Sequence, residues 1–260
     1  MQASYAGQYE ALWRHHWWWQ ARHQVVLDAL AELAPRRRAG AALPLLLDIG
    51  CGGGWAFDDF SRFCEVYGLE PNQELADVLP RWRSRIERRP FGPHYAGARA
   101  YDVVLMLDVL EHLADDKGAL ANLHHLLKPG GRLLLTVPAL PMLWSVHDEV
   151  NQHFRRYTWR GLRRALVGQG FEIEEMRYLF GWSLGLLLAR RWLSNPKAAY
   201  QVRIPPVWIN APLRWLSRFE EFVGRIFGGG PLLGSSLLAV ARRPATAASA
   251  YPTEARRRAA

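Results

Sequence analysis

Two acidic residues and a glycine-rich loop are the features of this chain best suited to chemistry. Asp48 follows the apolar run 45–47, and glycine fills four of the five positions 50–54 just beyond it. Glycines let such a turn adopt backbone angles closed to other residues, and they let a ligand lie against the main chain. A second apolar run ends at Glu70, whose carboxylate can accept hydrogen bonds from both hydroxyls of a ribose. The loop and the two acids together predict a nucleoside ligand.

The form of the loop narrows the ligand further. No Lys-Ser or Lys-Thr pair follows the glycines, which disfavours a mononucleotide phosphate loop. The spacing of Gly50, Gly52 and Gly54 differs from the Gly-x-Gly-x-x-Gly of dinucleotide folds, and it suits a ligand without a pyrophosphate. A plain turn without a ligand is the alternative that the loop by itself leaves open.

A second set of chemically active residues follows the apolar run 132–137. Histidine titrates near neutral pH, so His147 and His153 are candidate bases for the proton of a hydroxyl group. Asp148, beside the first histidine, completes the candidate catalytic set. Four residues of the same loop are candidates for substrate contact, the arginines as partners of an anionic group: Trp144, Arg155, Arg156 and Tyr157.

Two other interpretations of this loop are open. Asp148 and Arg156 can form a structural ion pair, with the two histidines packing or capping the loop. His147, Asp148 and His153 can also bind a metal ion, but their spacing matches no zinc pattern, so we expect no metal site.

These residues need a scaffold, and the chain alternates between short apolar runs and helical periodicities. Repeated strand-helix-strand units predict a parallel sheet with helices on both faces. The expected strands are Leu45–Ile49, Glu65–Leu69, one that we place only within 84–91, Tyr101–Leu107, 132–137, 171–178 and 236–241. The expected helices are 55–63, 72–79, 115–127 and 158–167.

Two segments lie outside this alternation. Residues 5–34 show the spacing of one helix and contain the cluster His15-His16-Trp17-Trp18-Trp19, which suits a lid, a membrane-interface belt or a helix packed over the core. Residues 179–193 are very apolar, and an amphipathic stretch follows at 213–227. With nearby arginines and tryptophans this insert resembles an interfacial membrane surface, and a cap over the substrate is the equal alternative.

The composition restricts the class of protein. Half of the 260 residues are hydrophobic, as in a folded chain, and the two cysteines fit a reducing compartment. No segment resembles a signal peptide and no apolar run is long enough to span a bilayer, so we expect a cytoplasmic protein. The net charge of +9 is either a plain arginine-rich surface or a sign of an anionic substrate or membrane. No known nucleic-acid module accompanies it, so we expect no nucleic-acid partner.

Four segments, in this order and spacing, resemble the class I S-adenosylmethionine-dependent methyltransferases. They are Leu46-Leu-Asp48-Ile-Gly50-Cys-Gly52-Gly-Gly54, Tyr67-Gly-Leu-Glu70-Pro, residues 101–113 with Asp108-Val-Leu-Glu111-His112, and residues 126–138 with Lys-Pro129-Gly-Gly131. The resemblance implies an α/β, Rossmann-like three-layer sandwich. Its seven-stranded sheet should be mostly parallel with an antiparallel last strand, and a helical cap insert should be added to it.

The resemblance also implies S-adenosylmethionine as cofactor, held by Asp48, Gly50, Gly52, Gly54, Glu70, Asp108 and Val109. The glycine loop should pack against the amino-acid end of the cofactor, with Asp48 near its ammonium group and Glu70 on the ribose. Asp108 and Val109 should line the methionine arm. The residue that often contacts adenine in this family has no clear equivalent between positions 88 and 98. Glu111-His112 is a common family pair that fits pocket architecture better than acid–base catalysis.

The expected reaction is methyl transfer to oxygen on a small or lipid-linked acceptor. The loop after the fifth strand resembles a bacterial subgroup that often accompanies glycan or lipid-linked assembly genes. The alternatives are a methyltransferase that acts on carbon or nitrogen of a soluble natural product, and a non-catalytic module that keeps the cofactor fold.

The predicted organisation has four parts: an N-terminal helical extension (1–43), the cofactor-binding methyltransferase domain (44–178 and 236–243), a hydrophobic helical cap insert (179–235) and a disordered tail (244–260). A hydrophobic acceptor would unite the basic charge with the insert, and it would place the protein peripherally on the inner face of the membrane.

Overall fold

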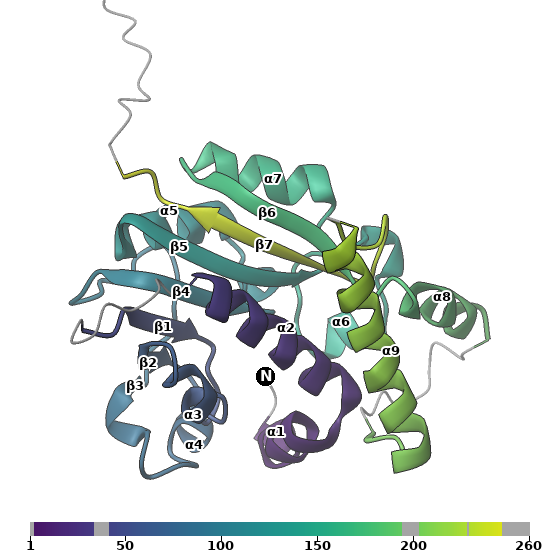
Figure 1. Cartoon of the computed structure of the whole chain (residues 1–260). Helices are drawn as coiled ribbons and strands as arrows, with labels where there is room; N and C mark the ends of the chain where they lie inside the picture. Colours follow the sequence, from purple (N-terminus) through teal and green to yellow (C-terminus); the bar gives the residue numbers. More distant parts are fainter. Residues whose placement is uncertain (1–2, 34–41, 194–202, 228, 246–260) are drawn as a thin grey trace, which may run out of the picture.

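A seven-stranded sheet forms the centre of the molecule in the computed structural model, which describes residues 3–33, 42–193, 203–227 and 229–245 (Figure 1). The strand order is β3-β2-β1-β4-β5-β7-β6. Strands β1 to β5 pair in parallel, and β7 pairs antiparallel with both β5 and β6. The strands are β1 (Leu45–Ile49), β2 (Glu65–Leu69), β3 (Ile86–Glu87), β4 (Tyr101–Leu107), β5 (Leu127–Pro138), β6 (Glu172–Leu179) and β7 (Ser236–Arg242). The predicted topology, with its antiparallel last strand, is confirmed.

Helices cover both faces of this sheet. On one face, α2 (Trp17–Leu33) and α3 (Phe57–Phe60) bury residues such as Val26 and Phe60 against apolar side chains of the sheet. On the other face, α5 (Asp116–Leu126) and α7 (Trp159–Gly168) bury Leu123 and Leu162 in a second apolar core. Each of these four side chains is completely buried, and burial of a large apolar side chain stabilises a fold by about 1.5–3 kcal/mol. The predicted three-layer sandwich is therefore confirmed.

The starts of three helices follow from capping residues in the sequence. The side chains of Asn72, Asp115 and Thr158 each accept a hydrogen bond from the backbone N–H three residues later. Such caps satisfy donors that the first helical turn leaves free. The helices that follow are α4 (Gln73–Ala76), α5 and α7, so each predicted start is confirmed to within one residue.

Four predicted elements of the sandwich differ from the structure in length. The helix expected at 72–79 is only the four-residue α4. The helix expected at 55–63 is only α3, because Phe57 and Asp59 bond three residues back, as in tight turns. The strand sought within 84–91 is the two-residue β3, after the short helix η1 (Arg83–Arg85). Strand β5 begins at Leu127, five residues earlier than expected.

The single N-terminal helix expected at 5–34 is wrong. The structure has α1 (Ala3–His15) and α2, with a break at His16. At the break, Trp17 N–H donates to Asn210 Oδ1 (2.8 Å), and Asn210 Nδ2 donates to His15 O (2.5 Å). The corner is therefore stabilised by a residue almost 200 positions away, which local periodicity cannot reveal.

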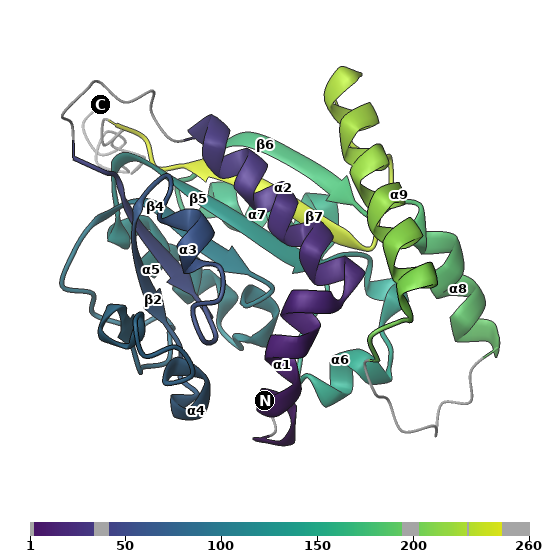
Figure 2. The same ribbon diagram turned by 60° about the horizontal axis from the view of Figure 1, so that its bottom comes forward.

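The insert between β6 and β7 contains α8 (Ser183–Leu193) and α9 (Val207–Ile226), so the second helix begins six residues before the predicted amphipathic stretch. Helix α9 packs beside α2 at the edge of the molecule (Figures 1 and 2). None of the helices in the described ranges is long and apolar enough to cross a bilayer. The predicted disordered tail lies outside the described residues beyond Ala245.

Candidate active site

The glycine loop lies at the carboxyl ends of β1 and β2. The N–H groups of Gly50 and Cys51 both donate to Leu69 O, at 2.8 and 3.2 Å, which fastens the loop to the end of β2. Gly50 has φ +74°, and a Cβ there would lie 2.6 Å from Val109 Cγ2. Only glycine therefore allows Val109, beyond the end of β4, to close against the loop. The two segments that the sequence assigned to one cofactor are neighbours.

Glu70 connects the loop to the end of β2. Its carboxylate accepts hydrogen bonds from Gly52 N–H and Asn72 N–H, both at 2.9 Å, and the residue is 7% exposed. Burial raises the pKa of Glu70, and these two backbone hydrogen bonds oppose the rise. Glu70 thus fixes the loop and also faces the cavity beside it.

Asp48, at 5% exposure, is the second acid of the pair. Burial raises its pKa to about 7, Arg22 acts against the rise, and the charge of Glu70 adds to it. A carboxyl with this pKa is close to half ionised at neutral pH, so a cation in the cavity would promote its ionisation.

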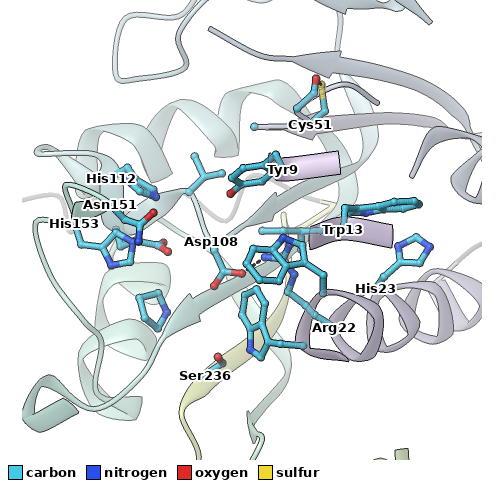
Figure 3. A pocket seen from close by; sticks show the side chains of 18 of the residues that line it. Tyr9, Trp13, Arg22, His23, Cys51, Asp108, His112, Asn151, His153 and Ser236 are labelled. Atoms are coloured by element: carbon cyan, nitrogen blue, oxygen red, sulfur yellow. Dashed lines mark hydrogen bonds and ion pairs between the residues drawn. The ribbon is translucent and has the colours of Figure 1, made fainter. Parts of the chain in front are cut away.

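A cavity of about 1340 Å³ opens against the loop (Figure 3). Single ligand pockets usually occupy roughly 300–1,000 Å³, so this volume can hold a cofactor together with an acceptor. The wall is contributed by α1, α2, the glycine loop, the turn after β4, the loop after β5, α8 and α9. Representative wall residues are Tyr9, Trp18, Arg22, Gly52, Glu70, Asp108, Glu111, His153, Leu187 and Leu213.

Buried polar atoms without partners lie in this wall. Trp55 Nε1 and both carboxylate oxygens of Glu111 have no hydrogen-bond partner within the described part of the chain. Burial and the nearby charge of Asp108 raise the pKa of Glu111 well above its ordinary value. Because an unpaired buried polar group costs about 1–3 kcal/mol, such atoms indicate a wall shaped for a polar ligand.

Arg22 is a wall residue that the sequence reasoning missed. Its guanidinium, from α2, forms an ion pair with Asp108 and lies 4.6 Å from the ring centre of Trp18. Asp108 also accepts a hydrogen bond from Thr136 Oγ1 (3.1 Å), and its φ of +56° turns the chain at the end of β4. The (i, i+4) spacing of Trp18 and Arg22 could have placed them on one helix face. No local signal points to Asp108, the other partner of Arg22, which lies 86 residues away.

The loop after β5 folds around Asp148. This residue caps α6 (Val146–Val150) from its third position, because its carboxylate accepts the backbone N–H of Ser145. It also accepts two hydrogen bonds from Arg156 (2.8 and 2.9 Å) and one involving His153 Nδ1 (2.9 Å). Burial opposes ionisation, but the bonds to His153 and Arg156 prevail and hold the pKa of Asp148 below its usual range. The Asp148–Arg156 ion pair that the sequence left open is present.

This arrangement leaves one nitrogen of His153 directed into the cavity. Because the ionised Asp148 can only accept, His153 Nδ1 carries a proton, and the neutral form of the ring therefore has its lone pair on Nε2. Phe154 N–H donates to Glu111 O (2.8 Å), which docks the loop on the short helix η2 (Leu110–His112). His112 and His153 then meet edge to face at 4.6 Å, and a ligand atom from each of Glu111, His112 and His153 lies within 4.8 Å of the others (Figure 3).

His147 also lines the cavity, 6.0 Å from the ring of His153. Burial lowers its pKa to about 4, and Asn151 Nδ2 lies 3.1 Å from its Nδ1. The same amide lies 3.5 Å from Nε2 of this ring and donates to His147 O (2.7 Å), so Asn151 fixes the position of the ring at the cavity wall.

Of the four predicted substrate contacts, only Arg156 lines the cavity. The other three, Trp144, Arg155 and Tyr157, lie outside its wall. Arg155 pairs with Asp116 (2.7 Å), and the hydroxyl of Tyr157 donates to the same carboxylate (2.8 Å). Both side chains thus anchor the loop to the first turn of α5. Trp144 is the third, and Gly54 likewise lies behind the wall, packed against Phe57 and Ile86.

Comparisons with known proteins agree with this geometry. A family model described as a methyltransferase domain matches residues 18–176. Ubiquinone biosynthesis O-methyltransferase of Pseudomonas paraeruginosa is 28% identical over 144 residues, which are 49% of this chain and 60% of that protein. The enzyme of the same name from Coxiella burnetii is 24% identical over 124 residues, 44% of this chain and 47% of the relative. The chain thus spans about half the length of these curated relatives.

Solved structures share the fold at low sequence identity. N-methyltransferase NodS from Bradyrhizobium japonicum, in complex with S-adenosylhomocysteine, has a TM-score of 0.51 at 15% identity, and the match covers 87% of both chains. The [4+2]-cyclase SpnF has a TM-score of 0.53 at 19% identity, with coverage of 88% of this chain and 84% of SpnF. The predicted S-adenosylmethionine is the cofactor to which the family match and the solved complexes point. The chain therefore belongs to the methyltransferase-domain family and has the class I, S-adenosylmethionine-dependent methyltransferase fold that its sequence predicted.

Proposed function

We propose that this chain transfers the methyl group of S-adenosylmethionine to a hydroxyl oxygen of a small or lipid-linked acceptor. The observation that carries the proposal is the position of His153, which faces the same cavity as the glycine loop and is held by the ionised Asp148. The relatives named as O-methyltransferases support the choice of oxygen.

The residues present fit the cofactor. Asp48 can face its ammonium group, Glu70 its ribose hydroxyls, and the backbone of Gly50 and Gly52 its amino-acid arm, as the sequence predicted. Trp55 Nε1 offers an unused donor beside them. Phe91 and Asn72, also in the wall, are our candidates for contact with the adenine, which the sequence left without a partner. When bound, the cofactor supplies a methyl group on a positively charged sulfur.

The remaining work falls to the chain's own residues. His153 Nε2 accepts the proton of the acceptor hydroxyl, and Asp148 stabilises the imidazolium that forms. Arg156 keeps Asp148 ionised and in place, so it is a positioning residue. The aromatic side chains of α1 and α2 shield the reacting groups from water and help to align the acceptor.

Arg22 is our candidate anchor for the cofactor's carboxylate, because its guanidinium already lies in the wall beside Asp48 and Asp108. We expect Arg22→Gln to weaken binding of S-adenosylhomocysteine roughly tenfold, since a charge-assisted hydrogen bond contributes about 1.5–3 kcal/mol. Arg14→Gln, which removes an exposed arginine of α1, is the matched control. Equal affinities of the two variants in equilibrium dialysis would contradict the proposed contact between Arg22 and the cofactor.

Cofactor affinity should depend on pH through Asp48. Its pKa is raised to about 7, and a nearby ammonium group favours its ionised form, so binding below pH 7 must release a proton. Affinity should therefore fall as pH is lowered, by up to roughly tenfold per unit below 7. Titrations with S-adenosylhomocysteine between pH 5.5 and 7.5 measure this slope. Asp48→Asn should flatten it, and an unchanged slope in that variant contradicts the assignment.

Features of the cavity support a lipid-linked acceptor. Its volume exceeds that of a usual single-ligand pocket, and the predicted cap insert contributes Leu186, Leu187 and Leu213 to its wall, beside Ser183 and Arg203. A lipid-linked hydroxyl compound fits a cavity that combines the polar residues of the candidate active site with these leucines. It also fits a protein that works peripherally on an anionic membrane surface, with α8 and α9 as cap.

A screen of candidate acceptors with labelled methyl donor, with and without lipid vesicles, tests the proposal. We expect incorporation into hydroxyl compounds with an apolar chain. Label that enters only amines or carbon atoms would assign the chain to the alternative chemistry. The cyclase among the solved neighbours shows that this fold alone does not fix the reaction.

A further inference from the structure

Helix α9 presents an apolar stripe to solvent. Trp208, Trp215, Phe219, Phe222 and Ile226 follow one another at spacings of 7, 4, 3 and 4 residues, which places them on one side of the helix. Their exposed fractions range from 47% to 76%, and the rings of Trp215 and Phe219 are stacked. Figure 2 shows the helix at the edge of the molecule, beyond the sheet. Contiguous exposed apolar surface of this kind marks an interaction site.

The charges of α9 are sorted between its two sides. Glu220 accepts the backbone N–H of Trp182 (2.9 Å), and Glu221 pairs with Arg177, so both acids are used inside the protein. Arg214 and Arg218, in contrast, are exposed and flank the stripe. The side chain of Arg214 donates to the neutral Gln20 (2.7 Å), and no acidic side chain pairs with it within the described ranges. The outward face of α9 is therefore apolar with a basic flank, on a chain of net charge +9.

The candidate active site is continuous with this region. Leu186 and Leu187 of α8 line the cavity and are 59% and 37% exposed, so the cavity reaches the surface there. Leu213, on α9 itself, lines the same cavity. A surface that engages α9 would consequently lie next to an apolar opening of the site.

We propose that the exposed face of α9 docks on an anionic lipid bilayer. The tryptophans and phenylalanines enter the boundary between headgroups and acyl chains, where such rings are favoured, and Arg214 and Arg218 meet lipid phosphates. The basic flank selects this occupant over a second copy of the chain, because two such faces would bring like charges together. The inference deepens the proposed function, since docking supplies a membrane-bound acceptor, but the docking surface rests on its own residues.

Vesicle co-sedimentation tests the proposal, with vesicles of phosphatidylcholine alone and of equal parts phosphatidylcholine and phosphatidylglycerol. The wild-type chain should sediment with the anionic vesicles, less with the neutral ones, and less at high salt. The double variant Trp215→Glu, Phe222→Glu should bind at least tenfold more weakly. Val167→Glu, an exposed valine of α7 on the far face of the sheet, should bind like the wild type. Arg214→Gln, Arg218→Gln should lose the preference for anionic vesicles.

Failure of the wild type to bind anionic vesicles, or equal binding by the double variant, overturns the proposal. A dimer in sedimentation velocity that the double variant dissociates overturns it as well, in favour of a second copy. Dialysis with S-adenosylhomocysteine, run on each variant, shows that the fold is intact. A variant that loses vesicle binding but keeps its affinity for S-adenosylhomocysteine has lost the docking surface and not the cofactor site of the proposed methyl transfer.

Discussion

Replacement of His153 by alanine is expected to reduce methyl transfer by on the order of 10²- to 10⁴-fold, the usual contribution of a positioned acid–base group. The reason is that Nε2 of this ring is the free lone pair that the Asp148 contact directs into the cavity. Affinity for S-adenosylhomocysteine should remain near the wild-type value, because none of the contacts assigned to the cofactor lies in the loop after β5. Single-turnover rates with labelled cofactor, beside equilibrium dialysis, separate the two effects.

Companion variants define the role of the ring. Asp148→Asn should reduce turnover strongly, since it removes the charge that sets the tautomer of His153. His147→Ala should reduce turnover less, because the proposed base is His153. His124→Ala, on α5 away from the cavity, is the control and should be unaffected. Activity of His153→Ala near the wild-type level would exclude the histidine as base, and loss of wild-type activity on treatment with a chelator would indicate a metal ion at Glu111, His112 and His153 instead.

Replacement of Glu70 by alanine should weaken binding of S-adenosylhomocysteine on the order of 10²-fold, since a carboxylate bonded to two ribose hydroxyls contributes two charge-assisted hydrogen bonds. The same side chain holds Gly52 N–H and Asn72 N–H, so its loss also loosens the glycine loop. Glu70→Gln keeps an acceptor of similar shape, so its affinity for S-adenosylhomocysteine should lie between those of the wild type and Glu70→Ala.

Glu65→Ala provides the matched control for this prediction. Glu65 begins the same strand, but it pairs with Arg85 at the surface, far from the loop. We expect its affinity in equilibrium dialysis to equal that of the wild type. Equal losses of affinity in both variants would mean that β2 is merely destabilised. Unchanged affinity in Glu70→Ala would contradict the proposed contact between Glu70 and the ribose.

The parts of the fold that the sequence predicted are those whose determinants are local. The strand that carries Asp48, the strand that Glu70 follows and the helix starts at Asn72 and Thr158 each depend on residues within a few positions. Parallel strands in a right-handed sandwich then bring the strand ends together, so the proximity of the glycine loop, Asp48 and Glu70 could be predicted from the sequence.

The acceptor half could be predicted only in part, because its geometry depends on contacts between distant segments. The loop after β5 was recognised as chemically rich, yet nothing local shows that Arg155 and Tyr157 turn toward Asp116 while His153 turns toward His112. Likewise, the break at His16 depends on Asn210, and the position of Arg22 depends on how α2 crosses the sheet. These residues come into contact because the layers pack against each other, and the spacing of residues along the chain does not predict such contacts.

A calorimetric titration of the wild-type chain with S-adenosylhomocysteine is the most direct measurement of the central claim. The account predicts saturable binding with one molecule per chain, lost or strongly weakened when Glu70 and Asp48 are both replaced by alanine. Absence of binding by the folded wild-type chain, or binding that the double variant retains in full, would contradict it.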